Sequence, residues 1–532
     1  MNENGFSRAL LIFFVAICII IVMAIVGNLS DEDEYNHYVS STLKLLSNPD
    51  NAEFDDELLA FAEKNSINLE IDHMDDLEAI EYLKTNSSDY DALWLSNSTW
   101  IYMLSGVTTL NSKSVNINPV VFGIKKSKAE ELGFVNKDVY NKDIVNAIRD
   151  KKLKYVMSSV TKTNTGLIAY LGFLNALAGS PEILTEDMLN DSRLEGELKT
   201  LFSGVERTSG TEDFLEEMFL KSDDYEAVIA TESSLIRINK ELVTQGKEPL
   251  YLIYPVDGVA INDSPLAYID NKQDKLELFN QVQSFVLSKE SQDKLEKMGK
   301  RTWYGGVKAN ADSNSFKKEW GIDTTKYLVP LKYPSKDVMD SALALYIDSI
   351  RKPSVTAFCL DISGSMAGDG IQSLKDAMNY VLDYDTAKKD QLQFSKYDKI
   401  YIIPFESELK DTISTSNGRD TERMINSIND LRPLGGTNLY GCASEAVKII
   451  AKENDDYTKT VILMTDGMPN LGTFNEFRNN YVSYGNGIPV YSIMFGSASQ
   501  SVLNEIADLT NAKVFDGRVN LTAAFKEVRS FN

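Results

Sequence analysis

Cysteine and histidine are scarce in this chain of 532 residues, which contains three cysteines and two histidines. Three cysteines are too few for a disulfide scaffold or a cysteine-rich zinc cluster. His37 and His73 lack the spacing of an H-E-x-x-H zinc site, and neither lies near a nucleophile motif. The chain also lacks the G-x-x-x-x-G-K-[ST] loop of an ATPase. We therefore predict a protein that is not an enzyme.

Basic residues are also in the minority. Lys and Arg together number 54 against 78 Asp and Glu, which gives a formal net charge of −24. A nucleic-acid-binding protein needs a basic face, so this balance argues against DNA or RNA as a partner. The hydrophobic content of 43% and the charged content of 25% are ordinary for folded domains. A chain of this length typically contains about three domains.

One apolar run is long enough to cross a membrane. Residues 9–27 carry no charge, and a helix of this length spans roughly the 30 Å of a bilayer core. A cleaved signal peptide is the alternative, but its apolar core is usually shorter, and an A-x-A cleavage pattern is missing here. Arg8 precedes the run and acidic residues 31–34 follow it, so the positive-inside rule places residues 1–8 in the cytoplasm. We expect a single-pass anchor in the cell membrane, with the bulk of the chain extracytoplasmic.

Strand-like and helix-like segments alternate over residues 38–305. Residues 41–47, 67–74 and 90–100 have strand character, and residues 54–65 have helical periodicity. This pattern predicts a parallel or mixed sheet flanked by helices, whose ligands would bind beyond the carboxyl ends of strands. Polar residues gather at those ends, where they are either ordinary helix caps or ligand-binding groups. The candidate ligand-binding residues are Ser47, Asn48, Ser96, Asn97, Ser98, Thr163, Asn164, Thr165, Glu232, Ser233 and Asp257.

The same region resembles the type II periplasmic solute-binding proteins in segments such as LKLLSNPDN, YDALWLSNSTW and MSSVTKTNTGLIAYLGFLNALAG. The resemblance implies two α/β lobes, a hinge and a cleft that binds small solutes, often anions. With a functional cleft, the protein would be a solute sensor or substrate-binding receptor that signals through its C-terminal domain. Without one, the domain would be a rigid interaction module.

Residues 306–353 are predicted to form a linker. Residues 305–315 are rich in Gly, Asn and Ser, which is typical of a loop. Residues 335–352 have helical periodicity and are bounded by Pro334 and Pro353. We expect a connecting helix that leads into the next domain.

Residues 354–532 have the pattern of an open, doubly wound α/β sheet, a Rossmann-like architecture. Residues 354–361, 399–405 and 489–495 are nearly continuous apolar strands, as expected for buried parallel strands, and helical segments lie between them. In such a fold the functional residues lie at the carboxyl ends of the strands.

Five oxygen-bearing side chains lie in three segments at these predicted strand ends. They are Asp361, Ser363, Ser365, Thr437 and Asp466. A hard divalent cation, Mg²⁺ or alternatively Ca²⁺ or Mn²⁺, prefers oxygen ligands, some of them from water. The hydroxyl ligands are neutral, and the two carboxylates can orient coordinated water from a second layer. An ion held in this way stays electrophilic and can accept a carboxylate from a partner.

The segments DISGS, GGTN and TDG resemble the metal-ion-dependent adhesion site of von Willebrand factor A domains, and all five ligand positions of that site are filled. The resemblance covers residues 354–532. It implies reversible, metal-dependent binding of a protein partner that supplies an acidic residue, as in an adhesion or scaffolding receptor. A domains also serve in chelatases beside ATPase partners, a role that an extracytoplasmic location argues against.

Two of the cysteines fall in this C-terminal domain. Cys359 lies in its first strand and Cys442 in the helix after Thr437, so they could be neighbours. We interpret them as two buried small apolar side chains.

Overall fold

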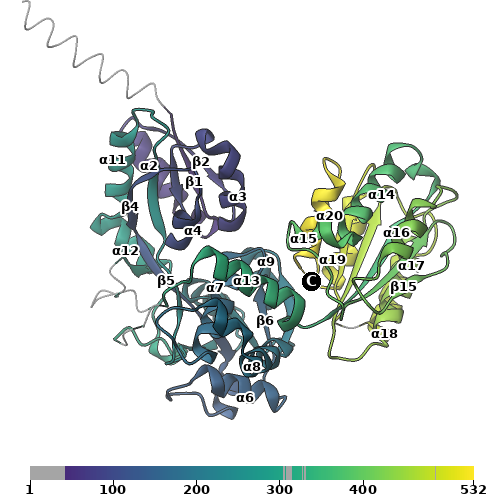
Figure 1. Cartoon of the computed structure of the whole chain (residues 1–532), viewed down its shortest axis with the longest axis horizontal. Coiled ribbons are helices and arrows are strands. Elements are labelled where there is room, and N and C mark those ends of the chain that lie inside the picture. Colours follow the sequence, from purple (N-terminus) through teal and green to yellow (C-terminus); the bar gives the residue numbers. More distant parts are fainter. Residues whose placement is uncertain are drawn as a thin grey trace, which may run out of the picture. The chain divides into compact units, whose positions relative to one another are not determined.

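The computed structural model describes residues 42–303, 306, 314–325, 328, 331–485 and 487–531 (Figure 1). The predicted anchor at 9–27 and most of the Gly/Asn/Ser-rich segment lie outside this part. Among the described residues, no helix combines the length and the apolar character needed to cross a bilayer. The described residues divide into two compact units. The first is made mainly of those up to Asn116 together with Asp263–Leu295, and the second mainly of Ile117–Asn262 and the described residues from Gly306 onward.

The first unit is an α/β lobe with a mixed five-stranded sheet in the order β2-β1-β3-β11-β4. Its strands are β1 (Thr42–Ser47), β2 (Asn68–His73), β3 (Ala92–Trp94), β4 (Thr109–Ser114) and β11 (Pro265–Ile269), and its helices include α2 (Asp55–Lys64), α3 (Asp76–Asn86), α4 (Ser98–Met103) and α11 (Leu276–Val286). β1, β2 and β3 are parallel, whereas β11 returns antiparallel. Aromatic rings pack between the helices and the sheet. The ring centroids of Phe54 and Trp94 are 6.0 Å apart in an edge-on arrangement.

The second unit begins with another α/β lobe, called here the second lobe, whose sheet has the order β10-β5-β8-β6-β7. Its strands are β5 (Asn116–Lys125), β6 (Tyr155–Ser158), β7 (Val205–Ser209), β8 (Ala227–Thr231), β9 (Leu250–Ile253), which also pairs with β5, and β10 (Ala260–Asn262). Its helices include α6 (Asn141–Arg149), α7 (Asn164–Leu177), α8 (Ser192–Ser203), α9 (Glu212–Lys221) and α10 (Glu232–Thr244). α7 is apolar on all sides and every one of its residues is buried, as expected for a helix without a polar face.

The predicted connecting helix is present as α13 (Lys336–Leu345), which continues as a π-helical turn over Tyr346–Ile350. It packs on the second lobe, because the Tyr170 hydroxyl donates to the Ala342 carbonyl at 2.9 Å and the ring of Phe202 meets Tyr346 at 5.1 Å. The linker therefore belongs structurally to the second lobe.

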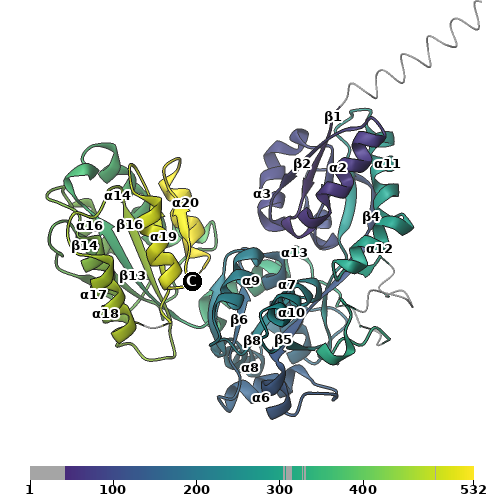
Figure 2. The same ribbon diagram turned by 180° about the vertical axis from the view of Figure 1, so that it is seen from behind.

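The C-terminal domain contains the predicted doubly wound sheet, in the order β15-β14-β13-β16-β17-β18 (Figure 2). Its strands are β13 (Ser354–Asp361), β14 (Lys399–Phe405), β15 (Ile413–Thr415), β16 (Thr458–Thr465), β17 (Val490–Met494) and β18 (Val514–Asp516), and its helices include α14 (Asp369–Leu382), α16 (Glu422–Asn429), α17 (Leu439–Ile450), α18 (Phe474–Tyr484), α19 (Gln500–Leu509) and α20 (Leu521–Arg529). All strands are parallel except β15.

Alternate side chains of β13 enter two separate cores, one on each face of the sheet. Val355 and Cys359 pack in the cluster that contains α17 and α18, and Phe358 and Leu360 pack in the cluster that contains α14 and α20. Burial on both faces explains why the strand is apolar throughout.

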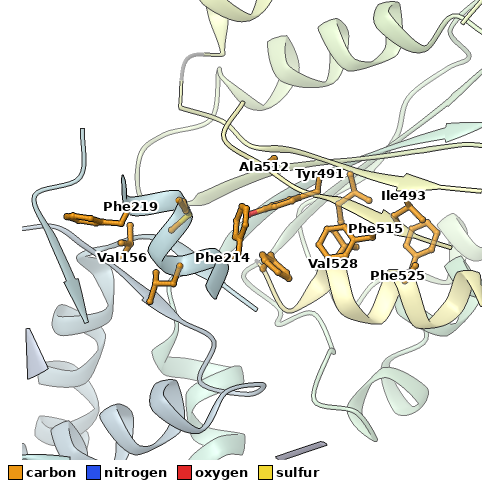
Figure 3. Close-up of a cluster of buried hydrophobic side chains, with 14 of the residues drawn as sticks. Val156, Phe214, Phe219, Tyr491, Ile493, Ala512, Phe515, Phe525 and Val528 are labelled. Carbon is orange, nitrogen blue, oxygen red and sulfur yellow. The ribbon is translucent and has the colours of Figure 1, made fainter. Parts of the chain in front are cut away.

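One apolar cluster is shared between the second lobe and the C-terminal domain (Figure 3). The ring of Phe214, from α9, meets that of Phe531 at 5.5 Å, and Phe531 meets Tyr491 at 5.4 Å. The Asn511 side chain also donates to the Met218 carbonyl at 3.0 Å. Within this unit the two parts are therefore joined by packing as well as by the linker.

The two cysteines of the C-terminal domain are joined. A disulfide connects Cys359 on β13 to Cys442 on α17, with their Cα atoms 6.0 Å apart. Our interpretation of two separate apolar thiols is wrong, because strand and helix pack closely enough to bring the two sulfur atoms together. Both residues are fully buried, so the bond links the sheet to a covering helix from within the core.

Breaking this bond should destabilise the C-terminal domain. The cysteines are 83 residues apart in the sequence, and releasing a loop of that size typically costs about 2–4 kcal/mol of unfolding free energy. Urea unfolding of wild type with and without a reductant measures this loss. A Cys359→Ala/Cys442→Ala variant is the matched control, and a reductant should leave its stability unchanged. Thiol labelling of Cys359 and Cys442 in protein that is unfolded without a reductant would contradict the bond.

Candidate metal centre

Three loops meet at the carboxyl edge of the C-terminal sheet. β13 and β16 are parallel neighbours with Leu360 opposite Met464, so the DISGS and TDG segments begin at the same edge. The GGTN segment is tied to DISGS by the backbone, since the Gly364 N–H donates to the Gly435 carbonyl at 3.0 Å. Parallel pairing thus gathers segments that are far apart in the sequence, as expected for this architecture.

Three of the five predicted metal ligands form a chain of short contacts, and a fourth lies nearby. The Oγ atoms of Ser363 and Ser365 are 3.0 Å apart, and the Ser365 hydroxyl donates to Asp466 Oδ1 at 2.7 Å. A Cβ atom built on Gly467 would lie 3.5 Å from Ser365 Oγ and 3.6 Å from Thr437 Oγ1, so Thr437 belongs to the same group. Ser365 is exposed, whereas the other three are buried. Their oxygen atoms therefore gather beside one point that solvent can reach.

The fifth residue, Asp361, is turned toward its neighbours and is fully buried. Its Oδ1 accepts the Ser363 N–H at 2.8 Å, and its Oδ2 accepts the Thr465 hydroxyl at 2.5 Å. Burial raises the pKa of the Asp361 carboxyl, and the hydrogen bonds from Ser363 and Thr465 oppose that rise. In this position the carboxyl fixes the backbone of the first loop.

The donor set fits a hard cation. Within the described part of the chain, no group of three or more His, Cys, Asp or Glu side chains could hold a metal ion, so a cation would depend on hydroxyl oxygens here. Burial raises the pKa of Asp466 too, against the hydrogen bond from Ser365. A cation beside two buried carboxyls would favour their charged forms and so offset their burial. Mg²⁺, Ca²⁺ and Mn²⁺ all accept such an oxygen set.

Several supporting residues are absent from the sequence prediction. Thr465 donates to Asp361. Asn470 holds Thr437 by two bonds: its side-chain Oδ1 accepts the Thr437 N–H at 2.9 Å, and its backbone N–H donates to the Thr437 carbonyl at 3.2 Å. Ser407 Oγ accepts the Gly436 N–H at 2.7 Å. Gly435 has a φ of +74°, in the left-handed region that favours glycine, and a β-carbon there would also displace the Glu406 carboxylate. No spacing in the sequence indicates these contacts between loops.

Two of the candidate ligand-binding residues of the first unit, Asn48 and Ser96, bond to the buried carboxyl of Asp76. The Asn48 side chain donates to it at 2.7 Å, and the Ser96 N–H donates at 2.9 Å. Ser47 is fully buried beside Asn48, and Asn97 caps α4 by accepting the Thr99 N–H at 3.0 Å. The Ser98 N–H donates to Asp263 at 2.8 Å. Each of these hydrogen bonds joins two residues of the first unit.

The candidate residues of the second lobe are likewise bonded to one another or to neighbours. Thr163 caps α7 by accepting the Gly166 N–H at 3.0 Å, and Asn164 donates to Asn262 at 2.8 Å, next to the buried Thr165. Ser233 accepts the Asn118 side chain at 2.8 Å. Asp257 accepts the Asn141 side chain at 3.0 Å.

Glu232 is held in a buried ion pair. Its carboxylate receives two hydrogen bonds from the Arg301 guanidinium, at 2.7 and 2.8 Å, and a third from the Tyr254 hydroxyl. Glu232 is fully buried and Arg301 nearly so. Both carboxylate oxygens are therefore used within the lobe.

The Asp76 carboxyl should make the stability of the first unit depend on pH. Burial raises its pKa to about 8, although the bonds from Asn48 and Ser96 oppose the rise. The folded state then holds a proton that the unfolded chain releases near pH 4, so stability should fall by up to about 1.4 kcal/mol per pH unit as pH rises toward 8. Chemical unfolding of wild type and Asp76→Asn across this range measures the effect, and the variant should show a flatter profile. Equal slopes in the two proteins would contradict it.

The pair between Glu232 and Arg301 should be worth much more than an exposed pair. Arg301→Met leaves a buried carboxylate without its partner and should cost about 3–5 kcal/mol of unfolding free energy. The exposed Arg193, beside Asp191, is the control, and Arg193→Met should cost less than about 1 kcal/mol. A Glu232→Leu/Arg301→Met variant should recover much of the loss. The interpretation fails if that double variant is as unstable as Arg301→Met alone.

Comparison with known proteins finds similarity in both parts of the chain. The von Willebrand factor type A domain model matches residues 357–529. The inter-alpha-trypsin inhibitor heavy chain H3 of Bos taurus is 24% identical over 157 residues, which are 27% of this chain and 17% of that protein. The chain thus spans less than a fifth of that relative's length.

Two solved structures are similar over the N-terminal part. An ABC transporter structure from Clostridium perfringens ATCC 13124 is 16% identical, covers 58% of this chain and 100% of its own, and has a TM-score of 0.43. A periplasmic thiamin binding protein is 13% identical, covers 57% and 93%, and has a TM-score of 0.44. From the family match and the doubly wound sheet, the C-terminal part of this chain is a von Willebrand factor type A domain.

Proposed function

We propose that this chain is a membrane-anchored, extracytoplasmic binding protein whose von Willebrand factor A domain (the A domain, residues 354–532) captures a protein partner through a divalent cation, Mg²⁺ in the first instance. The observation that supports this most is the gathering of Ser363, Ser365, Thr437 and Asp466 beside one solvent-accessible point. The anchoring part of the proposal is supported by the apolar run at 9–27.

The residues of the proposed metal site have different roles. The hydroxyls of Ser363, Ser365 and Thr437 would hold the cation, and Asp466 would balance its charge through Ser365. Asp361, bonded to the Ser363 N–H and to Thr465, keeps the first loop in place. The bound ion supplies an electrophilic centre for a carboxylate. Since the three hydroxyls are neutral, a partner's Asp or Glu would complete the charge balance.

The alternative function, a solute receptor acting through the N-terminal lobes, has less support. The Glu232 carboxylate is hydrogen-bonded by Arg301, and the Asp257 carboxylate is hydrogen-bonded by Asn141. Other candidates cap helices or bond to neighbouring residues. Ordinary capping and internal pairing account for these contacts without a ligand.

Removing one hydroxyl from the site should weaken cation binding without unfolding the domain. Ser365→Ala deletes the oxygen between Ser363 and Asp466, and we expect Mg²⁺ and Mn²⁺ affinity to fall about 10- to 100-fold. Calorimetric titration of the full chain measures this. Ser501→Ala, an exposed serine on α19 of the same domain, is the control and should bind as wild type does.

The same variants test partner capture. Intact cells displaying the full chain should retain partner protein in Mg²⁺, release it in EDTA, and retain none when the chain carries Ser365→Ala. Capture that persists both in EDTA and in the variant would refute the proposed function.

A further inference from the structure

A cavity of about 680 Å³ lies within the second unit, where the second lobe meets the A domain. The second lobe contributes Lys154, Arg207 and Tyr225 to its wall, the end of the linker contributes Lys352, and the A domain contributes residues of α18 and of β16 with the turn before it. A cavity of this size suits a small organic ligand. It is separate from the three loops of the metal site, none of whose five predicted ligands lines it.

A buried guanidinium without a carboxylate partner faces this cavity. Arg207, on β7, is 6% exposed, and it donates to the Tyr225 hydroxyl at 3.1 Å and to the Tyr491 hydroxyl at 2.8 Å. Its Nε has no hydrogen-bond partner among the described residues. Two neutral hydroxyls do not balance the charge of an arginine, and a buried cation without a counter-charge is costly.

Lys352 is a second cation in the wall without a carboxylate partner. Its Nζ donates to the carbonyl of Val205 at 3.3 Å, two residues before Arg207 on the same strand. Burial and the neighbouring Lys154 ammonium lower the pKa of Lys352. Both cations therefore lie near one stretch of β7. Neither forms an ion pair with a described carboxylate, although the nearby Glu206 and Asp455 carboxylates partly offset the lowering of the Lys352 pKa.

Most of the other charged groups of the wall lie nearer to one another than to Arg207 or Lys352. Lys154 lies 3.7 Å from Glu206, Lys459 lies 3.4 Å from Asp455, and Lys221 lies 3.8 Å from Asp508. The fourth acidic residue of the wall, Asp224, is exposed to solvent. The wall therefore carries five basic and four acidic side chains, a net excess of one positive charge, and Arg207 and Lys352 are the cations without an ion pair in the described part of the chain.

Aromatic rings make up another part of the wall. Tyr225 and Tyr481 are buried and Tyr484 is about half exposed, and all three line the cavity. Tyrosines combine apolar contact with a hydroxyl that can donate to an acceptor. The wall therefore suits a molecule with one anionic end and an organic body.

We propose that this cavity is a binding site for a small organic anion, with its phosphate or carboxylate group held by Arg207 and Lys352 and its body against the tyrosine rings. Arginine binds both groups through paired N–H donors. Because the wall comes from the second lobe and the A domain together, the bound molecule stabilises the contact between them. This site is independent of the proposed cation and partner.

Titration of the full chain with phenyl phosphate, benzoate and inorganic phosphate tests the site. Phenyl phosphate or benzoate should bind and raise the unfolding temperature, and the one that binds more tightly identifies the anionic group. Inorganic phosphate, which lacks a body to meet the rings, should bind more weakly. Arg207→Gln and Lys352→Gln should each weaken binding about tenfold or more, since each removes a charged hydrogen bond.

Arg149→Gln is the matched control, because Arg149 is a partly exposed arginine of the same lobe that pairs with Glu197 outside the cavity. It should bind as wild type does. Circular dichroism and thermal unfolding of each variant verify that the chain is folded, and if Arg207→Gln does not fold, Lys352→Gln decides alone. The proposal is overturned if neither organic anion binds, or if Lys352→Gln binds them as tightly as the control.

Discussion

The parallel pairing of β13 with β16 is the constraint on which the proposed metal site depends. It places the ends of two strands side by side, so that Ser365 and Asp466, 101 residues apart in the sequence, come within 2.7 Å. β13 is apolar on both faces and its alternate side chains fill two cores, which holds the strand in the middle of the sheet. The disulfide between Cys359 and Cys442 ties the same strand to α17, the helix that begins just after Thr437. Core packing and site geometry thus share one strand.

Away from the proposed metal site, most buried polar groups bond to one another and so stabilise the fold. In the second lobe, Glu232 and Arg301 satisfy each other, and the hydroxyls and amides at strand ends cap helices or bond to neighbours. Such groups stabilise a lobe because leaving them unpaired would be costly. Arg207 departs from this rule, since its charge is met only by tyrosine hydroxyls at the contact with the A domain. A polar loop or a buried charge therefore indicates a binding site only when its partners have been accounted for.

Much of the fold could be predicted from the sequence, because periodicity reports burial directly. We could predict the doubly wound sheet from the unbroken apolar run of β13 and the alternation of strands and helices. We could place Asp361 and Asp466 because each follows the end of a predicted strand. Contacts between distant segments could not be predicted in this way. The disulfide, the pairing of Glu232 with Arg301 across 69 residues, and the support of Thr437 by Asn470 all depend on which loops and elements meet in space. The position of Arg207 against Tyr491, 284 residues later, depends on how the second lobe packs on the A domain.

The most direct test of the account is a crystal structure of the protein grown with Mn²⁺, with diffraction data collected near the manganese absorption edge. The account predicts one anomalous peak among the hydroxyls of Ser363, Ser365 and Thr437, which vanishes when EDTA is added. An absence of any peak at saturating Mn²⁺, or a peak bound by other residues while these hydroxyls keep their present bonds, would contradict it.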